Sequence, residues 1–293
     1  MTRGIGPRMV ATAVAVAIVA VACGGSDTTE RTEPGGAMRI EYGDHPDAFG
    51  DLWLPDPSDA GSPAPVVVLI HGGFWRDGFF LDLMDPLIPS LLERGVAVWN
   101  IEYRRVGAGG GHPETFEDVA SAVDHLARMS DDVAGSLDLA RIAVVGHSAG
   151  GHLAAWAAGR SSLAAGAVGA DPVVRPVLAV SQAGVLDLVG CAEQGVGGAA
   201  CVDLVGVRPS ADPERYDTTS PTEMVPFDAM VVAVHGELDR IVPPSQSVTF
   251  VERATAAGMD ATYLPIPDAD HFSNLDPRHP AWIAVLGSLA ENL

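Results

Sequence analysis

The feature that most constrains the fold is the segment 141–159, RIAVVGHSAGGHLAAWAAG, where a serine lies between a strand-like and a helix-like run. The apolar residues 142–145 are typical of a buried strand, and the apolar positions after the glycines recur at helical spacing. Gly146 and Gly150 flank Ser148 and remove the Cβ atoms that would collide in a hard strand-to-helix turn. The segment predicts a nucleophilic Ser148; the alternative is a glycine-rich turn that carries an ordinary serine.

A serine hydroxyl becomes a good nucleophile only with a general base within hydrogen-bond reach and an acid that orients the base. In doubly wound hydrolases the acid and then the histidine follow the serine, each in a loop after a strand. Asp239 follows the apolar run 230–234, and His271 follows the run 261–264. We therefore expect Asp239 to orient His271 and His271 to act as the base, with Glu237 as the nearest rival for the acid.

The other polar residues near these motifs are expected to serve the structure. His147 is expected to pack beside the turn or shape the pocket, His152 to lie in the core or behind the site, and His235 to make a structural hydrogen bond. Asp270 is expected to face solvent, because it is adjacent to His271 and neighbouring side chains point apart. Surface positions are the default for the loop histidines His45, His112 and His279. No cluster has metal-ligand spacing and no phosphate-binding loop is visible, so we expect no cofactor.

Acyl transfer also needs hydrogen-bond donors for the oxyanion. We expect one to be the backbone N–H of Ala149, at the start of the helix. The second is expected from the loop HGGFW at 71–75, which follows the apolar run 66–70, and the sequence leaves Gly73 and Phe74 as equal candidates. Aromatic residues around these loops either shape the pocket or pack in the core: Phe74, Trp75, Phe79, Phe80 and Phe272.

Strands and helices alternate along the chain, which predicts an α/β fold: a doubly wound, mostly parallel sheet with helices on both faces. Strands are expected at 38–42, 49–54, 66–70, 96–101, 142–145, 177–181, 230–234 and 261–264. Helices are expected at 82–94, 114–129, 248–257 and 281–293, and a further helix is expected directly after the turn at Ser148. We expect one catalytic domain over 39–293, because 293 residues with 47% hydrophobic content can bury one large core.

The stretch 184–225 has no long periodic segment and is expected to form a small cap insertion over the site. It contains Cys191 and Cys201, which an exported protein would pair in a disulfide; two buried free thiols are the alternative.

The N-terminus predicts export. Residues 1–22 combine arginines with a short apolar run and read as a signal peptide. The following Cys23 resembles the lipid-modified cysteine of a bacterial lipoprotein, although Ala20 stands where such signals usually have a larger aliphatic residue. Residues 23–38 then read as a flexible tether. We expect a cell-envelope lipoprotein held to the membrane by its lipid anchor only, with ordinary secretion as the alternative.

The formal charge of −21, with arginine as the only basic residue type besides histidine, argues against a nucleic-acid partner, because phosphate binding needs a basic patch. The sequence does not determine the oligomeric state.

The motifs HGGFW, GHSAGG, HGELDRIVP and DADHF occur in this order, and the chain over about 39–293 resembles the α/β-hydrolase superfamily. More narrowly, HGGFW and the stretch NIEYRR resemble the esterase/lipase-like branch that includes kynurenine formamidases and bacterial feruloyl-esterase-like hydrolases. The resemblance implies a serine hydrolase that cleaves small-molecule carboxylic esters through a Ser-His-Asp triad and an acyl-enzyme. The alternatives are an arylformamidase or other amidase, and a non-catalytic binding protein. The lipoprotein-like start and the Cys191–Cys201 insertion depart from cytosolic kynurenine formamidases.

Overall fold

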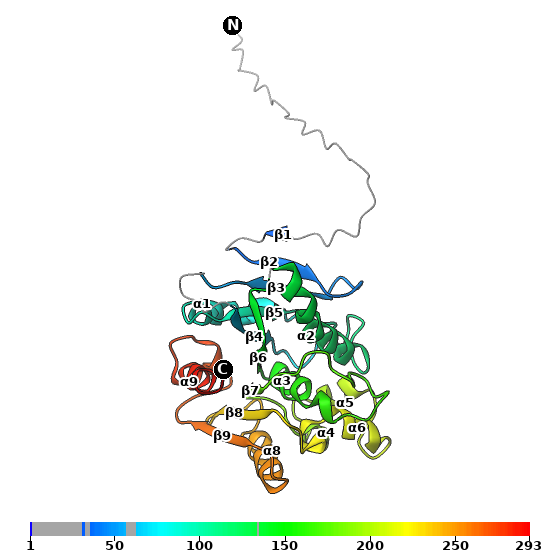
Figure 1. The fold of residues 1–293 in the computed structure, drawn as a ribbon. Coiled ribbons are helices and arrows are strands. Elements are labelled where there is room, and N and C mark those ends of the chain that lie inside the picture. The colour runs from blue at the N-terminus through cyan, green and yellow to red at the C-terminus, as the bar shows by residue number, and fades with distance from the viewer. Residues whose placement is uncertain (2–30, 33–35, 57–62, 134) are drawn as a thin grey trace.

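A computed structural model describes residue 1 and residues 31–32, 36–56, 63–133 and 135–293. Within these residues nine strands form one sheet (Figure 1). In sheet order they are β1 (Arg31–Thr32), β2 (Met38–Glu41), β3 (Phe49–Trp53), β5 (Ala97–Ile101), β4 (Ala64–Ile70), β6 (Leu137–His147), β7 (Leu178–Gln182), β8 (Met230–Gly236) and β9 (Ala261–Ile266). The strands β1, β2, β3 and β5 pair antiparallel in turn, and β5 through β9 pair parallel.

Helices cover both faces of this sheet (Figure 1). On one face lie the 3₁₀ helix η1 (Leu81–Leu87), α1 (Ile88–Leu92) and α9 (Pro280–Asn292), and on the other lie α2 (Glu114–Asp132), α3 (Ala149–Gly159) and α8 (Ser245–Ala256). Two short 3₁₀ helices, η2 (Arg160–Ser162) and η3 (Ser273–Leu275), complete these connections. The expected α/β fold class is confirmed.

The central strands show why their sequence is apolar at every position. In β4, Val66 and Val68 pack in the core beneath α2 and α3, whereas Val67 and Leu69 pack in the core beneath α1 and α9. Burial of each such side chain stabilises the folded chain by about 1.5–3 kcal/mol relative to leaving it in water. Because the strand is buried on both faces, it reads as a continuous β-branched run rather than as an alternating one.

The prediction of one continuous helix over 82–94 is wrong in detail. The chain forms η1 and then the five-residue α1 over this stretch. Pro86 lies inside η1 and Pro89 near the start of α1. Proline has no N–H to donate and its ring collides with the preceding turn, so one continuous α-helix cannot form here.

The segment 184–225 contains four short helices between β7 and β8: α4 (Leu188–Gln194), α5 (Ala200–Val205), α6 (Pro213–Thr219) and α7 (Pro221–Met224). None exceeds seven residues, which is too short for a helical period to be visible in the sequence. The predicted disulfide is present: Cys191 and Cys201 are joined, with their Cα atoms 6.2 Å apart. It links α4 to α5.

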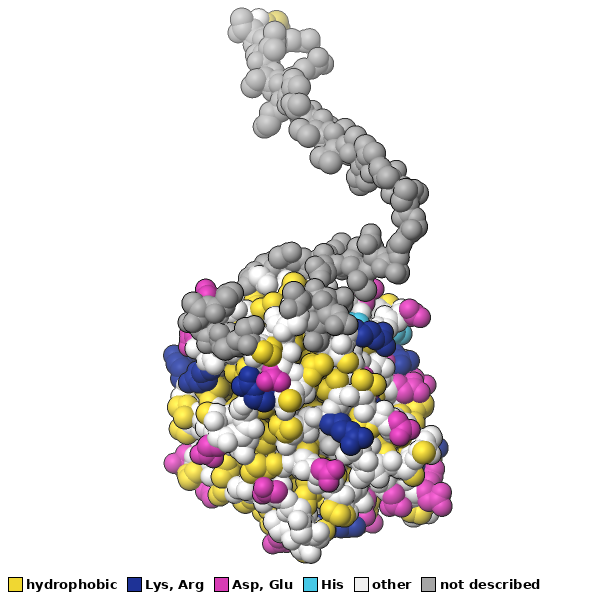
Figure 2. All heavy atoms as spheres, in the orientation of Figure 1, with side chains coloured by type: hydrophobic (Ala, Val, Ile, Leu, Met, Phe, Trp, Pro, Cys, Tyr) yellow, Lys and Arg dark blue, Asp and Glu magenta, His cyan; other side chains and the backbone are white. Residues whose placement is uncertain are grey.

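The expected signal peptide and Cys23 lie outside the described residues, as does most of the expected tether; the part of the tether at Arg31–Thr32 pairs with Met38 and Arg39 as β1. Among the described residues, no helix combines the length and apolar character needed to span a bilayer. Figure 2 shows acidic side chains spread over one face of the molecule with basic side chains dispersed among them. This face therefore gathers no basic patch.

Candidate active site

The serine lies at a strained turn between β6 and α3. Ser148 has φ 57° and ψ −117°, a conformation that non-glycine residues rarely adopt. A Cβ on Gly146 would overlap the backbone of Gly150, and a Cβ on Gly150 would overlap the carbonyl of Ile70. Both glycines are therefore required for α3 to start directly against β4 and β6, and the turn leaves Ser148 at the carboxyl edge of the parallel strands.

The residues predicted as acid and base are hydrogen-bonded to each other. His271 Nδ1 donates to Asp239 Oδ2 over 2.7 Å, and both side chains are buried. Asp239 Oδ1 also accepts the backbone N–H groups of Ile241, at 2.8 Å, and Val242, at 2.9 Å. Among the described residues no hydrogen bond is formed by the other ring nitrogen of His271, Nε2. His271 and Ser148 line the same cavity.

Two further histidines hold this pair. His235 Nε2 lies 3.2 Å from Asp239 Oδ2, and its Nδ1 lies 2.8 Å from Ser247 Oγ. Burial alone would raise the pKa of Asp239, but the hydrogen bonds from His235 and His271 hold it well below its usual range. Asp239 is thus a fixed carboxylate. The sequence predicts a structural hydrogen bond for His235 but not its contact with Asp239.

His147, the residue before the serine, holds His271 from the other side. Its Nε2 lies 2.9 Å from the backbone oxygen of His271, and the two rings are 4.7 Å apart. Burial, and then the proximity of His271, lowers the pKa of His147 to about 3. The neutral ring must carry its proton on Nε2 to bond a carbonyl oxygen, so His147 fixes the backbone of His271 and adds no charge beside it.

The expected oxyanion donors lie around the same point. Ala149 is the first residue of α3, where a backbone N–H has no partner within the helix. Gly73 and Phe74 line the cavity with Ser148, and both have positive φ, 116° and 53°. Within the part of the chain that the structure describes, neither of their N–H groups bonds to another protein atom. Donors from two loops are therefore free near the nucleophile.

The cavity at Ser148 is small and apolar. It has a volume of about 110 Å³. Its wall is formed by Gly73, Phe74, Phe79, Leu83, His147, Ser148, Ile241, His271, Phe272 and Leu275. Phe79, Ile241 and Phe272 are also exposed to solvent, so they line the mouth. None of these residues comes from 184–225, but Gly197 of that segment contacts the outer side of the Phe74 ring.

The remaining predicted residues lie away from the reaction centre. Glu237 and Asp270 are exposed, which leaves Asp239 as the carboxylate on His271. Trp75 is fully buried and packs edge-on against His152, whose Nε2 lies 2.8 Å from the backbone oxygen of Thr219. Both therefore belong to the core behind the loop. Among the described residues no group of three His, Cys, Asp or Glu side chains is placed to hold a metal ion.

Comparison with known proteins gives consistent matches. The BD-FAE family profile matches residues 51–254. Esterase LipC of Mycobacterium tuberculosis is 30% identical over 81% of the chain, and Esterase LipQ of the same organism is 29% identical over 77%. The chain spans 60% and 54% of the length of these two relatives. A solved truncated carbohydrate esterase from gut microbiota has a TM-score of 0.74 at 20% identity, over 92% of this chain and 98% of that one.

Proposed function

We propose that this chain, which belongs to the BD-FAE family and has the α/β-hydrolase fold, is a serine hydrolase that cleaves carboxylic esters. One observation carries the proposal: Asp239 binds His271 at 2.7 Å, and His271 shares a cavity with Ser148 at a strained strand-to-helix turn. Nucleophilic acyl transfer uses a serine, a histidine base and an acid that orients the histidine, and this arrangement brings the three residue types to one site.

The reaction follows from these contacts. Because Nδ1 of His271 is bound to Asp239, Nε2 is the nitrogen that takes the proton from Ser148 Oγ. The oxygen attacks the ester carbonyl, and the tetrahedral intermediate collapses as His271 returns the proton to the leaving alcohol. Water then attacks the acyl-Ser148 ester as His271 takes a proton from it. His271 returns this proton to the leaving Ser148 Oγ, which releases the carboxylic acid and restores the free enzyme.

The negative oxygen of the intermediate needs donors that are already in place, because oriented dipoles in a site without water stabilise charge most. The N–H of Ala149 supplies one and also carries the positive end of the α3 dipole. An N–H of Gly73 or Phe74 supplies the second, since neither has an acceptor among the residues that the structure describes.

The cavity favours an ester with a short, uncharged acyl group. Apart from Ser148 and two histidines, His147 and His271, its wall consists of glycine and apolar side chains. A charged group placed there would lose its hydration without gaining a partner. The formyl group of N-formylkynurenine is also short and uncharged, so the arylformamidase alternative is tested directly beside the esters.

The direct test is hydrolysis of p-nitrophenyl acetate, butyrate and octanoate beside N-formylkynurenine by the full chain. We expect butyrate to be cleaved, formylkynurenine to be left intact, and Ser148→Ala to abolish turnover. Ser162→Ala, in η2 directly after α3, is the matched control and is expected to leave the rate unchanged. A strong preference for formylkynurenine would support the amidase alternative, and a folded protein that cleaves none of them would support a binding role.

We also propose that the protein is an exported envelope lipoprotein, with Cys23 as the lipidated residue and residues 23–38 as the tether. The support is the charged, apolar and then cysteine-containing order of the N-terminal sequence. Metabolic labelling with an alkyne fatty acid in a bacterial host tests it. Cys23→Ala is expected to lose the label and leave the membrane fraction, whereas an unlabelled wild type would indicate ordinary secretion.

A further inference from the structure

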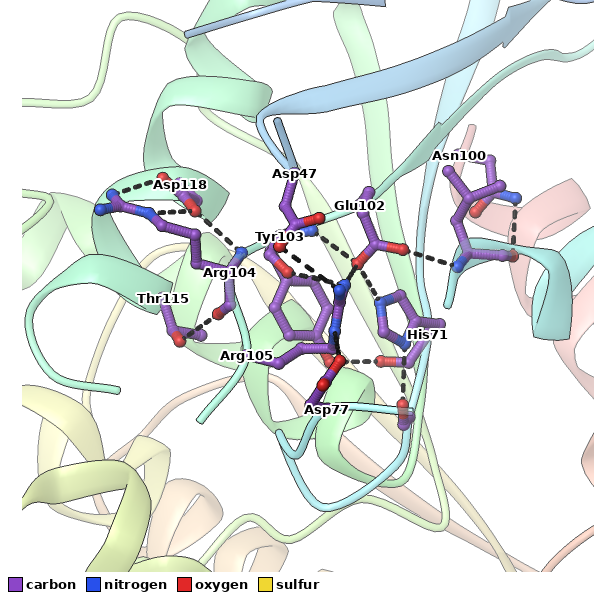
Figure 3. Close-up of polar contacts among 12 residues, drawn as sticks. Asp47, His71, Asp77, Asn100, Glu102, Tyr103, Arg104, Arg105, Thr115 and Asp118 are labelled. Atoms are coloured by element: carbon purple, nitrogen blue, oxygen red, sulfur yellow. Dashed lines mark hydrogen bonds and ion pairs between the residues drawn. The ribbon is translucent and has the colours of Figure 1, made fainter. Parts of the chain in front are cut away.

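A buried charged network lies directly behind the oxyanion loop, at the carboxyl ends of β4 and β5 (Figure 3). Parallel pairing places Ile70 beside Ile101, so the next residues, His71 and Glu102, come out of the sheet side by side. His71 is fully buried, and Glu102 is 1% exposed. Neither side chain lines the cavity at Ser148, and the reaction described above uses neither.

Both ring nitrogens of His71 face acceptors. Nδ1 lies 2.8 Å from the backbone oxygen of Gly72, and Nε2 lies 2.8 Å from Glu102 Oε1. A carbonyl oxygen can only accept a hydrogen bond, so Nδ1 must carry a hydrogen. Nε2 must also carry one if Glu102 is ionised, and the ring is then a cation.

Every other contact of Glu102 indicates that it is ionised. Its carboxylate accepts the N–H groups of Tyr103, at 2.9 Å, and Leu81, at 3.1 Å, and an N–H of the Arg105 guanidinium. Burial alone would raise the pKa of Glu102, but the His71 hydrogen bond, the Tyr103 N–H and the Arg105 charge hold it below its ordinary value. Hydrogen bonds from donors stabilise the ionised form of a carboxyl group, so these contacts favour the carboxylate.

The surroundings can hold a second positive charge beside Arg105. The Arg105 guanidinium also lies 3.3 Å from Asp47 and 3.7 Å from Asp77, so acidic groups neutralise it on its outer side. The Tyr103 ring stacks on the His71 ring with centroids 4.4 Å apart and an interplanar angle of 14°. An electron-rich ring face against an imidazolium is a favourable contact. Figure 3 shows His71, Glu102, Tyr103 and Arg105 in one cluster, with Asp47 and Asp77 beside Arg105.

The hydrogen bond from Nδ1 determines the direction of one oxyanion donor. The carbonyl of Gly72 and the N–H of Gly73 belong to the same peptide unit, and in a planar trans peptide they point in opposite directions. Because His71 holds that carbonyl on its own side, the Gly73 N–H points to the other side. Gly72 lies close to Ser148, since a Cβ on Gly72 would lie 3.0 Å from the Ser148 Cβ, and Gly73 lines the same cavity as Ser148.

We propose that His71 is a permanently protonated imidazolium, held by Glu102, that positions the Gly73 N–H as the second oxyanion donor. The role in catalysis rests on the proposed hydrolase function; the charge of His71 does not. His71 is a positioning residue, because it acts through the Gly72–Gly73 peptide and does not touch substrate. The proposal also selects Gly73 over Phe74, which the sequence leaves open.

Two substitutions of His71 test its contact with Gly72 separately from its contact with Glu102. In His71→Asn the amide nitrogen can take the place of Nδ1 and still donate to Gly72, whereas in His71→Gln it can take the place of Nε2 and reach only Glu102. We expect His71→Gln to lower kcat by about tenfold to a hundredfold with KM nearly unchanged, because an oxyanion donor acts in the transition state. His71→Asn is expected to keep at least about tenfold more kcat than His71→Gln.

Arg104→Gln is the control for loss of a neighbouring, partly buried ion pair. It breaks the neighbouring pair with Asp118, at 2.7 Å, without touching His71. We expect a lower melting temperature and an unchanged kcat. The positioning role would be overturned by equal losses of kcat in His71→Asn and His71→Gln. It would also be overturned if Arg104→Gln lost as much kcat as His71→Gln.

The charge is tested without any substrate, by ¹⁵N NMR of the full chain labelled at histidine, with the His71 signals assigned from their loss in His71→Asn. We expect both His71 ring nitrogens to stay protonated from about pH 8 to about pH 9, where an ordinary histidine is neutral. A bare ring nitrogen on His71 at neutral pH would overturn the proposal. If wild type cleaves no ester, the proposed function fails separately, and the rate of Ser148 labelling by a fluorophosphonate then replaces kcat in the comparison of the two variants.

Discussion

The substitution Asp239→Asn tests the hydrogen-bond arrangement around the acid. Asp239 Oδ1 accepts two backbone N–H groups, from Ile241 and Val242, and Oδ2 accepts from His271 and lies 3.2 Å from His235. An asparagine side chain must keep its oxygen toward the two backbone donors. Its NH₂ group therefore replaces Oδ2 and faces His271 Nδ1.

This orientation reverses the tautomer of His271. Nδ1 must now accept from the amide, so the remaining proton moves to Nε2, the nitrogen that serves as the base for Ser148. We expect kcat to fall by about 10³-fold to 10⁴-fold, which corresponds to about 4–5.5 kcal/mol of transition-state stabilisation. The change in KM is expected to be small, because substrate binding does not use Asp239.

The assay is steady-state hydrolysis of p-nitrophenyl butyrate at neutral pH, with circular dichroism to verify that the variant is folded. Glu237→Gln is the matched control: it removes a carboxylate from the same loop, but an exposed one, and should leave kcat unchanged. The reasoning is refuted if folded Asp239→Asn keeps kcat within about tenfold of wild type, or if Glu237→Gln loses as much.

Three further predictions concern stability and specificity. Burial lowers the pKa of His152 to about 4 in the folded chain. Below the pKa that this histidine has in the unfolded chain, the unfolded chain binds a proton that the folded chain excludes, so lowering the pH from 7 to 5 should reduce the free energy of unfolding by about 2 kcal/mol. Urea unfolding of His152→Gln should show a pH dependence smaller by that amount. Replacing Cys191 and Cys201 by serine, which opens a loop of sequence separation 10, should lower the free energy of unfolding by about 2.5 kcal/mol, and an unchanged urea midpoint would contradict this. Leu275→Ala should enlarge the cavity and raise kcat/KM for octanoate relative to butyrate by about tenfold, whereas an unchanged chain-length profile would mean that the acyl group lies elsewhere.

The location of the acid and the base could be predicted because chain order and strand order coincide in the second half of the sheet. β6, β7, β8 and β9 are neighbours in sequence and in space, so loops that follow them meet at one edge. Ser148, Asp239 and His271 each follow such a strand. The glycines beside Ser148 carry their own steric signal, since a Cβ on either would overlap backbone atoms.

The His71 and Glu102 pair depends on a strand order that the sequence does not give directly. β5 lies outside β4 in the sheet, and only their register, Ile70 beside Ile101, brings the two residues together. A signal was present, because a glutamate directly follows five buried positions of β5 and a buried charge requires a partner. The contact of His235 with Asp239 likewise depends on how the loop after β8 folds back.

Helices were predicted less well where they are short. The two prolines at 86 and 89 divide the stretch after the oxyanion loop, and an amphipathic pattern read across them overstates the helix. In 184–225 the helices are fixed by caps such as Asp187 and Asp212, whose side chains accept the N–H groups of Gly190 and Arg215. With so few turns each, apolar periodicity has no room to appear.

The central claim is that Ser148 carries the acyl group during ester hydrolysis, and trapping that intermediate tests it most directly. The full chain is mixed with p-nitrophenyl butyrate, quenched in acid within the first turnover, digested and analysed by mass spectrometry. The account predicts a butyryl group on the peptide that contains Ser148, and none in Ser148→Ala, which should also release no p-nitrophenol burst. Turnover by Ser148→Ala at the wild-type rate, or an acyl group found only on another residue, would contradict the account.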